Sequence, residues 1–176
     1  MENKKIFLHI CCAPCSIEVI DALIKDGYEI YGYFYNPNIH PFDEYKRRRD
    51  SVIKYLEKLG FEYEIADYDV HEYFDAIGEY RVGKERCKRC YDLRMENSAK
   101  RASELGYQEF STTLLFNPHK DFKFIAEVGK KNAELQNLSF IFPKLAHDYW
   151  GNKKKAKDLN LYFQKYCGCV FSTTEK

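Results

Sequence analysis

The chain has 176 residues, of which 45% are hydrophobic, and it carries 28 lysines and arginines against 27 aspartates and glutamates. This length and hydrophobic content indicate one globular domain, residues 1–176, and exclude a disordered chain. A net charge of +1 excludes a uniformly basic surface, so local basic patches would have to bind any nucleic acid. No stretch is long and apolar enough for a signal peptide or a membrane helix, so we expect a cytoplasmic protein.

Strand-like and helix-like segments alternate along nearly the whole chain. The expected strands span Lys5–Ile10, Tyr28–Tyr35, Glu62–Ala66, Glu109–Thr113 and Leu138–Phe142. The expected helices span Ser16–Lys25, Asp43–Leu59, Arg86–Leu105, Asn117–Leu135 and Lys153–Gln164, and a short one within Asp67–Lys84. This alternation predicts an α/β fold with a doubly wound, mostly parallel five-stranded sheet and helices on both faces.

All seven cysteines fall into three tight groups. They are Cys11-Cys12-Ala13-Pro14-Cys15, Cys87-Lys88-Arg89-Cys90 and Cys167-Gly168-Cys169. The first group directly follows the first strand, and open parallel sheets bind their ligands beyond the carboxyl ends of the strands. In a reducing compartment, clustered thiols indicate metal or redox chemistry rather than structural disulfides.

The first two cysteine groups together supply enough thiols for a metal centre. Cys87-x-x-Cys90 near a helix start would present both sulfurs on one side, and the helix dipole would favour their thiolates. With Cys11 and Cys12 this makes four thiolates, which suffice for a [4Fe–4S] cluster or a zinc site. The pair Cys167 and Cys169 would form a strained, easily reduced disulfide, or would bind a second metal.

Four motifs in the chain resemble those of the QueH-type epoxyqueuosine reductases. They are His9-Ile10-Cys11-Cys12-Ala13-Pro14-Cys15, Glu85-Arg86-Cys87-Lys88-Arg89-Cys90-Tyr91-Asp92-Leu93-Arg94, Thr112-Thr113-Leu114-Leu115 and Tyr166-Cys167-Gly168-Cys169. The resemblance implies an iron–sulfur, cobalamin-independent oxidoreductase with a Rossmann-like fold of the HUP type. Its expected reaction reduces the epoxide of epoxyqueuosine in the tRNA anticodon to queuosine, the last step of queuosine biosynthesis. Phe163 departs from the family, which carries a basic residue there, and position 15 varies in the family between Cys and Asp.

Reduction of an epoxide to an alkene removes one oxygen and consumes two electrons and two protons, whereas a [4Fe–4S] cluster ordinarily passes single electrons. The preferred assignment therefore places the cluster on Cys11, Cys12, Cys87 and Cys90 and makes Cys167 and Cys169 a redox-active pair beside it. The competing assignment uses Cys15 and part of the C-terminal pair to bind an additional mononuclear iron, which would act as a Lewis acid on the epoxide oxygen. The sequence leaves both assignments open.

Candidate proton donors and RNA contacts complete the expected site. His9, Tyr91 and Tyr166 lie close to the thiols in sequence and are either proton donors or packed side chains. The basic runs Lys46–Arg49 and Lys153–Lys155 with Lys157 are either solvated faces or contacts to the phosphates of the tRNA anticodon arm. We also expect a partner that donates electrons to the protein, and the sequence does not identify it.

Three polar residues after the expected strands also have two interpretations. Thr112, Thr113 and Asn36 either contact the modified base or stabilise turns, and the structural role is favoured. Two other functional classes compete with the reductase: a zinc-binding RNA-interaction module, and a thiol-disulfide oxidoreductase that uses Cys87 and Cys90 and leaves five cysteines unexplained. The chain has neither a G-x-G-x-x-G nor a Walker A motif, so a nucleotide cofactor is not indicated.

Overall fold

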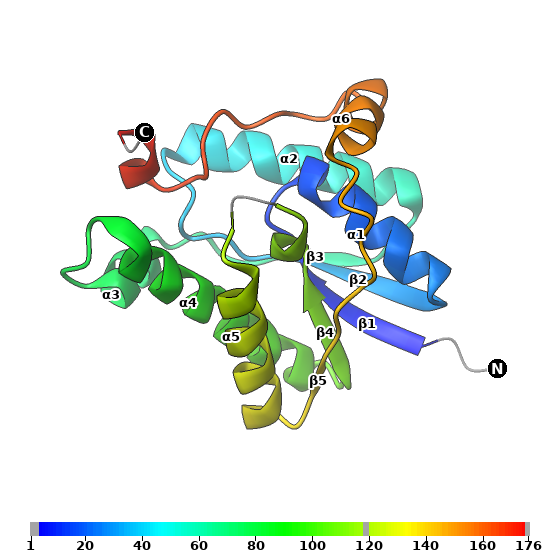
Figure 1. Ribbon diagram of the computed structural model, residues 1–176, viewed down its shortest axis with the longest axis horizontal. Coiled ribbons are helices and arrows are strands. Elements are labelled where there is room, and N and C mark those ends of the chain that lie inside the picture. The colour runs from blue at the N-terminus through cyan, green and yellow to red at the C-terminus, as the bar shows by residue number, and fades with distance from the viewer. Residues whose placement is uncertain (1–3, 118–119, 175–176) are drawn as a thin grey trace.

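A parallel sheet with its first strand at the centre organises the fold (Figure 1). The computed structural model describes residues 4–117 and 120–174. Its strands are β1 (Lys4–His9), β2 (Tyr28–Phe34), β3 (Tyr63–Ile65), β4 (Glu109–Thr112) and β5 (Ser139–Phe140). They pair in parallel in the order β3-β2-β1-β4-β5. The order reverses between β1 and β4, so the topological switch point lies at the carboxyl end of β1.

Helices cover both faces of this sheet. They are α1 (Ala13–Lys25), α2 (Phe42–Leu59), α3 (Val70–Ile77), α4 (Gly83–Glu104), α5 (Phe122–Leu135) and α6 (Tyr149–Asp158), with the 3-10 turns η1 (Thr113–Phe116) and η2 (Val170–Thr173). Figure 1 shows α1 and α2 on one side of the sheet and α4 and α5 on the other. The predicted doubly wound α/β architecture is therefore confirmed.

Alternating side chains of β1 build a separate core on each face, because successive residues of a strand point to opposite sides. Ile6 and Leu8 are fully buried among residues of α1 and α2. Phe7 is fully buried on the other face among residues of α4 and α5. Burial on both faces explains why this strand is almost continuously apolar. The strand is thereby fixed in place, and with it the position of the cysteines that follow.

Several helix boundaries differ from those predicted, and local capping explains most of the differences. Helix α1 begins at Ala13 rather than Ser16, because the Cys12 side chain caps it and Pro14 suits its first turn. Helix α6 begins at Tyr149 rather than Lys153, because Asp148 caps it, and it ends at Asp158.

Two further boundaries bear on the site. Helix α4 begins at Gly83, three residues before the predicted start, so Cys87 lies more than one turn inside it. Helix α5 begins at Phe122, after the capping residue Asp121, and not at the predicted Asn117-Pro118. Pro118 lies outside the described residues. None of the helices in the described ranges combines the length and apolarity needed to cross a bilayer.

Candidate metal and redox site

A cavity of about 560 Å³ lies at the switch point of the sheet. Segments that follow β1, β2 and β4 line it, together with α4 and the C-terminal segment. All seven cysteines are among its lining residues, and all seven are free thiols. The fold therefore brings the three cysteine groups of the sequence together around one cavity. The alternative of a thiol-disulfide oxidoreductase that uses only Cys87 and Cys90 does not explain why the other five cysteines lie there.

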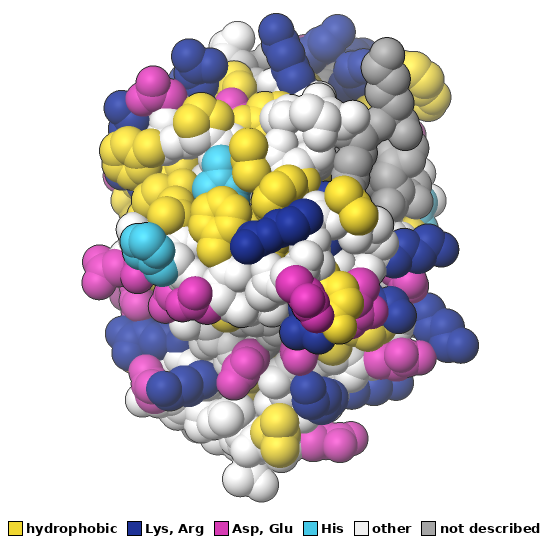
Figure 2. All heavy atoms as spheres, turned by 90° about the vertical axis from the view of Figure 1, so that its left-hand side faces the viewer, with side chains coloured by type: hydrophobic (Ala, Val, Ile, Leu, Met, Phe, Trp, Pro, Cys, Tyr) yellow, Lys and Arg dark blue, Asp and Glu magenta, His cyan; other side chains and the backbone are white. Residues whose placement is uncertain are grey.

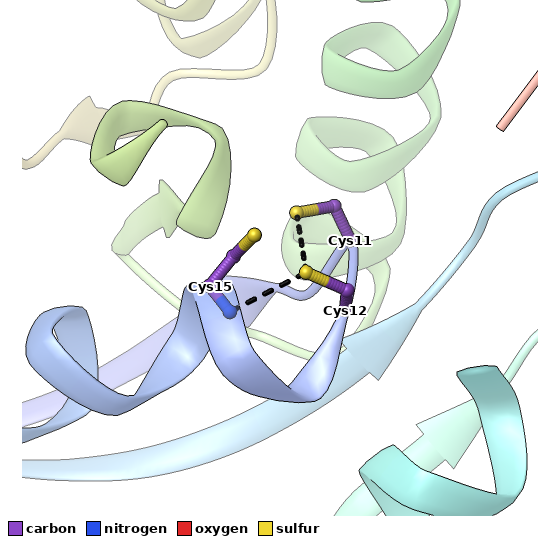
Figure 3. Close-up of side chains that lie close together, drawn as sticks. All are labelled: Cys11, Cys12 and Cys15. Carbon is purple, nitrogen blue, oxygen red and sulfur yellow. Dashed lines mark hydrogen bonds between the residues drawn. The ribbon is translucent and has the colours of Figure 1, made fainter. Parts of the chain in front are cut away.

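The first cysteine group forms a compact triad at the start of α1 (Figure 3). The sulfurs of Cys11, Cys12 and Cys15 all lie within 4.8 Å of one another. Cys12 is the extended N-cap residue, and its sulfur accepts a hydrogen bond from the backbone N–H of Cys15 at 3.3 Å. Cys12 thus caps α1 with a sulfur in place of the usual hydroxyl or carboxylate. Cys15, which the preferred assignment set apart, lies with the other two.

Hydrogen bonds and a nearby cation favour one negative charge on this triad. The thiols of Cys12 and Cys15, followed by Arg94 and Thr113, hold the pKa of Cys11 well below its usual range in spite of burial. Burial raises the pKa of Cys12, and hydrogen bonds to Cys11 and Cys12 raise that of Cys15. Thr113 Oγ1 lies 3.2 Å from Cys11 Sγ and also accepts the Cys11 N–H at 2.9 Å. These directions favour a thiolate at Cys11 over one at Cys12 or Cys15.

The cavity lining is cationic. Its basic residues are Arg86, Arg94, Lys120, Lys153 and Lys165, and no aspartate or glutamate of the described chain lines it. Arg94 is 3% exposed and donates to Asn36 Oδ1 at 2.7 Å, while Asn36 Nδ2 donates to the carbonyl of Ile10 at 2.9 Å. Asn36 therefore links the buried arginine to the backbone that follows β1, and it also lines the cavity. Such a lining attracts thiolates and phosphates alike.

The second cysteine group does not have the electrostatics that the sequence predicts. Cys90 lies well beyond the first turn of α4, where the helix dipole no longer acts strongly. Burial raises its pKa to about 11. Cys87 is less buried, and its sulfur lies 3.7 Å from the guanidinium of Arg86. The predicted stabilisation of a Cys90 thiolate by the helix dipole therefore does not apply, because Cys90 lies beyond the first turn and burial favours its neutral thiol.

The third cysteine group approaches the cavity from the C-terminal segment. Lys120 Nζ lies 2.6 Å from Cys167 Sγ. Although Cys167 is an exposed residue, its sulfur lies among cations, and the charges of Lys120, Arg94 and Arg48 hold its pKa below the usual value. Cys169 is buried in a small cluster with Cys90.

Aromatic rings cover this cluster from outside. Phe74 of α3 and Phe171 of η2 pack against it, and the guanidinium groups of Arg81 and Arg86 lie over the ring of Phe171. Hydrophobic side chains gather in the upper half of that face of the molecule (Figure 2). The rings shield Cys90 and Cys169 from solvent on this side.

A buried arginine of α2 holds the backbone of the third group. Arg48 is 2% exposed and donates to the carbonyls of Cys167 and Tyr166 at 2.9 and 3.0 Å. Its Nε donates to Glu44 Oε1 at 2.8 Å. Neither interpretation of the run Lys46–Arg49, a solvated face or a contact to tRNA phosphates, holds for Arg48, which is buried and points into the protein.

Glycine is required at the centre of the third group. Gly168 has φ of 140°, a conformation that residues with side chains rarely adopt. A Cβ there would lie 3.2 Å from Arg48 Nη1 and 3.3 Å from Asn38 Nδ2. The carbonyl of Gly168 accepts the backbone N–H of His40 at 2.8 Å. The Cys-Gly-Cys turn is therefore closely fitted to the segment that follows β2.

The three candidate proton donors occupy different environments. His9 is fully buried and does not line the cavity. Its Nε2 lies 3.0 Å from the carbonyl of Tyr35 and must donate to it, so Nδ1 accepts from the Thr112 hydroxyl at 2.8 Å. Burial and the charge of Arg94 lower the pKa of His9 to about 3, which keeps it neutral. Thr112 also caps η1, so it has the structural role that was favoured.

Two tyrosines do line the cavity. Burial raises the pKa of Tyr91 to about 12. Tyr166 donates its hydroxyl to the carbonyl of His40. The structure also adds two polar residues that the sequence did not single out, Lys120 beside Cys167 and Gln164, whose Nε2 donates to Cys12 Sγ at 3.0 Å. No motif marks either of them, because each is an isolated polar residue brought in by the fold.

Solved structures with a similar fold include tRNA-modifying proteins. The U34-tRNA thiolase NcsA from Methanococcus maripaludis, solved with its [4Fe-4S] cluster, matches with a TM-score of 0.62 at 18% identity, over 98% of this chain and 62% of that one. A predicted subunit of a tRNA methyltransferase from Methanocaldococcus jannaschii matches with a TM-score of 0.57 at 16% identity, over 88% and 74%. At these identities the likeness establishes the fold alone. The protein is a doubly wound, Rossmann-like α/β protein with a thiol-lined cavity at its switch point.

Sequence comparisons identify the family. The profile of the family described as epoxyqueuosine reductase QueH matches residues 6–175. Proteins of that name from Helicobacter pylori, Haemophilus influenzae and Thermotoga maritima are 38%, 36% and 32% identical over 95%, 97% and 97% of this chain. The chain belongs to the QueH family of epoxyqueuosine reductases, which confirms the resemblance. It spans 49%, 72% and 91% of these three relatives, so it covers about half the length of the Helicobacter protein.

Proposed function

We propose that this protein reduces the epoxide of epoxyqueuosine in tRNA to the alkene of queuosine, the last step of queuosine biosynthesis. The observation that carries the proposal is that seven thiols and five basic side chains line one and the same cavity, in a chain of the QueH family. The thiols suit an electron-transferring cofactor, and the basic residues suit the phosphates of an RNA substrate.

The donor set suits an iron–sulfur cluster. Three sulfurs within 4.8 Å of one another and four more around the same cavity exceed what a single zinc ion requires. Cys11, Cys12, Cys87 and Cys90 would hold a [4Fe–4S] cluster, which supplies electrons one at a time. In the alternative arrangement Cys15 and one C-terminal thiol would hold an additional mononuclear iron.

The thiols of Cys167 and Cys169 would balance the electrons of the reaction. Oxidation of the two thiols to a disulfide releases two electrons and two protons, and reduction of the epoxide to an alkene and water consumes the same number. Both residues line the cavity, and Lys120 favours the thiolate of Cys167. An external electron donor would then reduce the disulfide and complete the cycle.

Tyr91 is the best-placed proton donor for the departing oxygen. It lines the cavity, and with a pKa near 12 its hydroxyl stays protonated at neutral pH. Tyr166 already donates to a backbone carbonyl, and His9 lies behind the cavity wall with both ring nitrogens hydrogen-bonded. These contacts favour Tyr91 over the other two candidates.

Replacement of Tyr91 by phenylalanine should lower the rate of epoxide reduction by about a hundredfold or more, the usual contribution of a general acid. The iron content should stay unchanged, because the hydroxyl is not expected to be a ligand. Single-turnover rates with Tyr91→Phe and with Tyr166→Phe as the matched control would measure this. A Tyr91→Phe protein that turns over at the wild-type rate removes Tyr91 from the mechanism.

The proposed reaction itself has a direct test. Protein purified without oxygen is incubated with tRNA that contains epoxyqueuosine and with a chemical reductant, and the tRNA is then digested to nucleosides. Mass spectrometry should show a nucleoside lighter by one oxygen atom, and its yield should depend on the protein. The purified protein should be brown and contain iron. An unchanged nucleoside mass with an iron-loaded protein would contradict the proposed reaction, and a colourless zinc protein would contradict the proposed cofactor.

A further inference from the structure

An exposed aromatic pair stands beside the cavity at the start of α6. Tyr149 lines the cavity and is 46% exposed, and the neighbouring Trp150 is 75% exposed. We propose that Trp150 is a stacking platform for an unpaired base of the anticodon loop next to the modified nucleotide. This inference rests on the proposed function, since it concerns how the same site holds its RNA.

The exposure of Trp150 indicates a binding surface, because tryptophan side chains are normally largely buried in folded proteins. The rings of Tyr149 and Trp150 meet edge to face, with centroids 5.7 Å apart. The indole therefore stands out from the surface with little covering it. Aromatic rings presented in this way to single-stranded RNA stack on bases whatever their sequence.

Helix α6 holds the aromatic pair at a fixed position relative to the thiols. Asn152 Nδ2 donates to the carbonyl of Pro14 at 2.8 Å, and Lys155 forms an ion pair with Asp21 of α1 at 2.7 Å. Pro14 lies between Cys12 and Cys15, so one turn of α1 supports both the sulfur triad and α6. Figure 1 shows α6 lying against α1, far from α4 and α5. A base stacked on Trp150 would thus lie at a set place beside the cavity.

The charge around the pair suits RNA. Lys153 lines the cavity, and its Nζ lies 5.5 Å from the centre of the Trp150 ring. Lys154 and Lys157 are exposed on the same helix, and Lys165 is exposed at the cavity wall. The nearby Asp148 is engaged in capping the helix. Protein surfaces that bind single-stranded RNA combine aromatic rings with basic side chains. The basic side chains contact the phosphate backbone, and the rings stack on the bases.

Trp150 also provides the signal for a direct test, because it is the single tryptophan of the chain. The probe is an unmodified RNA hairpin with the sequence of the anticodon arm, which binds without reacting. Titration of the iron-loaded protein with this hairpin should quench tryptophan emission. Polyphosphate, which carries charge without bases, should leave the emission unchanged. Trp150→Ala should bind the labelled hairpin about five- to a hundredfold more weakly, and Trp150→Phe should retain most of the affinity.

Two variants serve as matched controls. Phe142 is 42% exposed with Lys130 Nζ 5.3 Å from its ring centre, but it does not line the cavity, so Phe142→Leu should bind normally. Lys153→Gln should bind more weakly and with a smaller dependence on salt, while the quenching at saturation persists. The iron content of Trp150→Ala should equal that of the wild type.

Three results would overturn the inference. The first is a hairpin that binds without changing the tryptophan emission. The second is a Trp150→Ala protein that binds the hairpin as tightly as the wild type. The third is an emission that changes with protein concentration in the absence of RNA, which would make the aromatic pair a self-association surface. Failure of the proposed function is a separate result. It would appear as an unreacted epoxide with the wild-type protein, whatever the hairpin does.

Discussion

Serine in place of Cys11 or Cys12 should remove both the proposed cluster iron and the proposed epoxide reductase activity. A hydroxyl is a poor ligand for iron–sulfur clusters, which cysteine thiolates normally hold. The effect should be all or none, because the sulfurs of the triad lie within 4.8 Å of one another and the low pKa of Cys11 depends on its neighbours. Iron analysis and visible absorbance of the variants purified without oxygen would measure the loss.

The remaining cysteines divide according to the proposed roles. Cys87→Ser and Cys90→Ser should also lose the cluster, whereas Cys167→Ser should keep iron and colour and serves as the matched control. The ligand set is wrong if Cys15→Ser loses all its iron while Cys87→Ser loses none. A Cys167→Ser protein with its cluster reduced in advance is expected to fail in a single turnover. A turnover at the wild-type rate would rule out the redox-active pair.

Replacement of Arg48 by methionine should destabilise the protein by about 3–5 kcal/mol, the usual effect of removing one partner of a buried ion pair. Glu44 would be left 6% exposed without its cation, and the carbonyls of Tyr166 and Cys167 would lose their donor. The Cys-Gly-Cys turn should therefore loosen, and epoxide reduction should fall with it. Denaturant unfolding and single-turnover assays would measure the two effects.

Two further variants separate stability from the position of the turn. Arg47→Met changes an exposed arginine of the same helix and should alter stability by less than about 0.5 kcal/mol. The double variant Arg48→Met with Glu44→Gln removes both charges, so much of the stability should return. Its activity should stay low, because the two carbonyls still lack a donor. Full recovery of activity in the double variant would show that Arg48 stabilises the fold without positioning the turn.

The fold follows from the sequence because its strongest signals are local. The central strand β1 is a short apolar run, and helices separate successive strands, which leaves few alternatives to a parallel sheet. The three cysteine groups are also recognisable in the sequence, because several cysteines lie within a few residues of one another in each group. The start of α6 was misplaced because the single side chain of Asp148 decides it, and the lysines that follow carry no boundary signal. Caps of this kind shift an element by a turn without changing the architecture.

The directions of individual side chains were much harder to predict. Four consecutive basic residues suggest one solvated face, yet Arg48 lies one helical turn from Glu44 and both are buried under a segment more than a hundred residues away in sequence. His9 stands next to the cysteine motif in sequence, but it is fully buried and bonds to Thr112 and to the Tyr35 carbonyl instead of lining the cavity. Lys120 reaches Cys167 only through the tertiary fold. Contacts between residues far apart in the chain cannot be predicted from the local amino-acid pattern around either residue.

The cavity lining without carboxylates has a consequence for the choice of metal. An RNA substrate carries Mg²⁺ with it, and proteins usually hold this hard cation beside phosphates through carboxylate oxygens. The described walls offer sulfur and positive charge in place of such oxygens. Sulfur is a soft ligand that prefers iron and other soft or borderline metals. If the protein acts on RNA as proposed, the same lining would suit the phosphates of the RNA better than the magnesium that accompanies them.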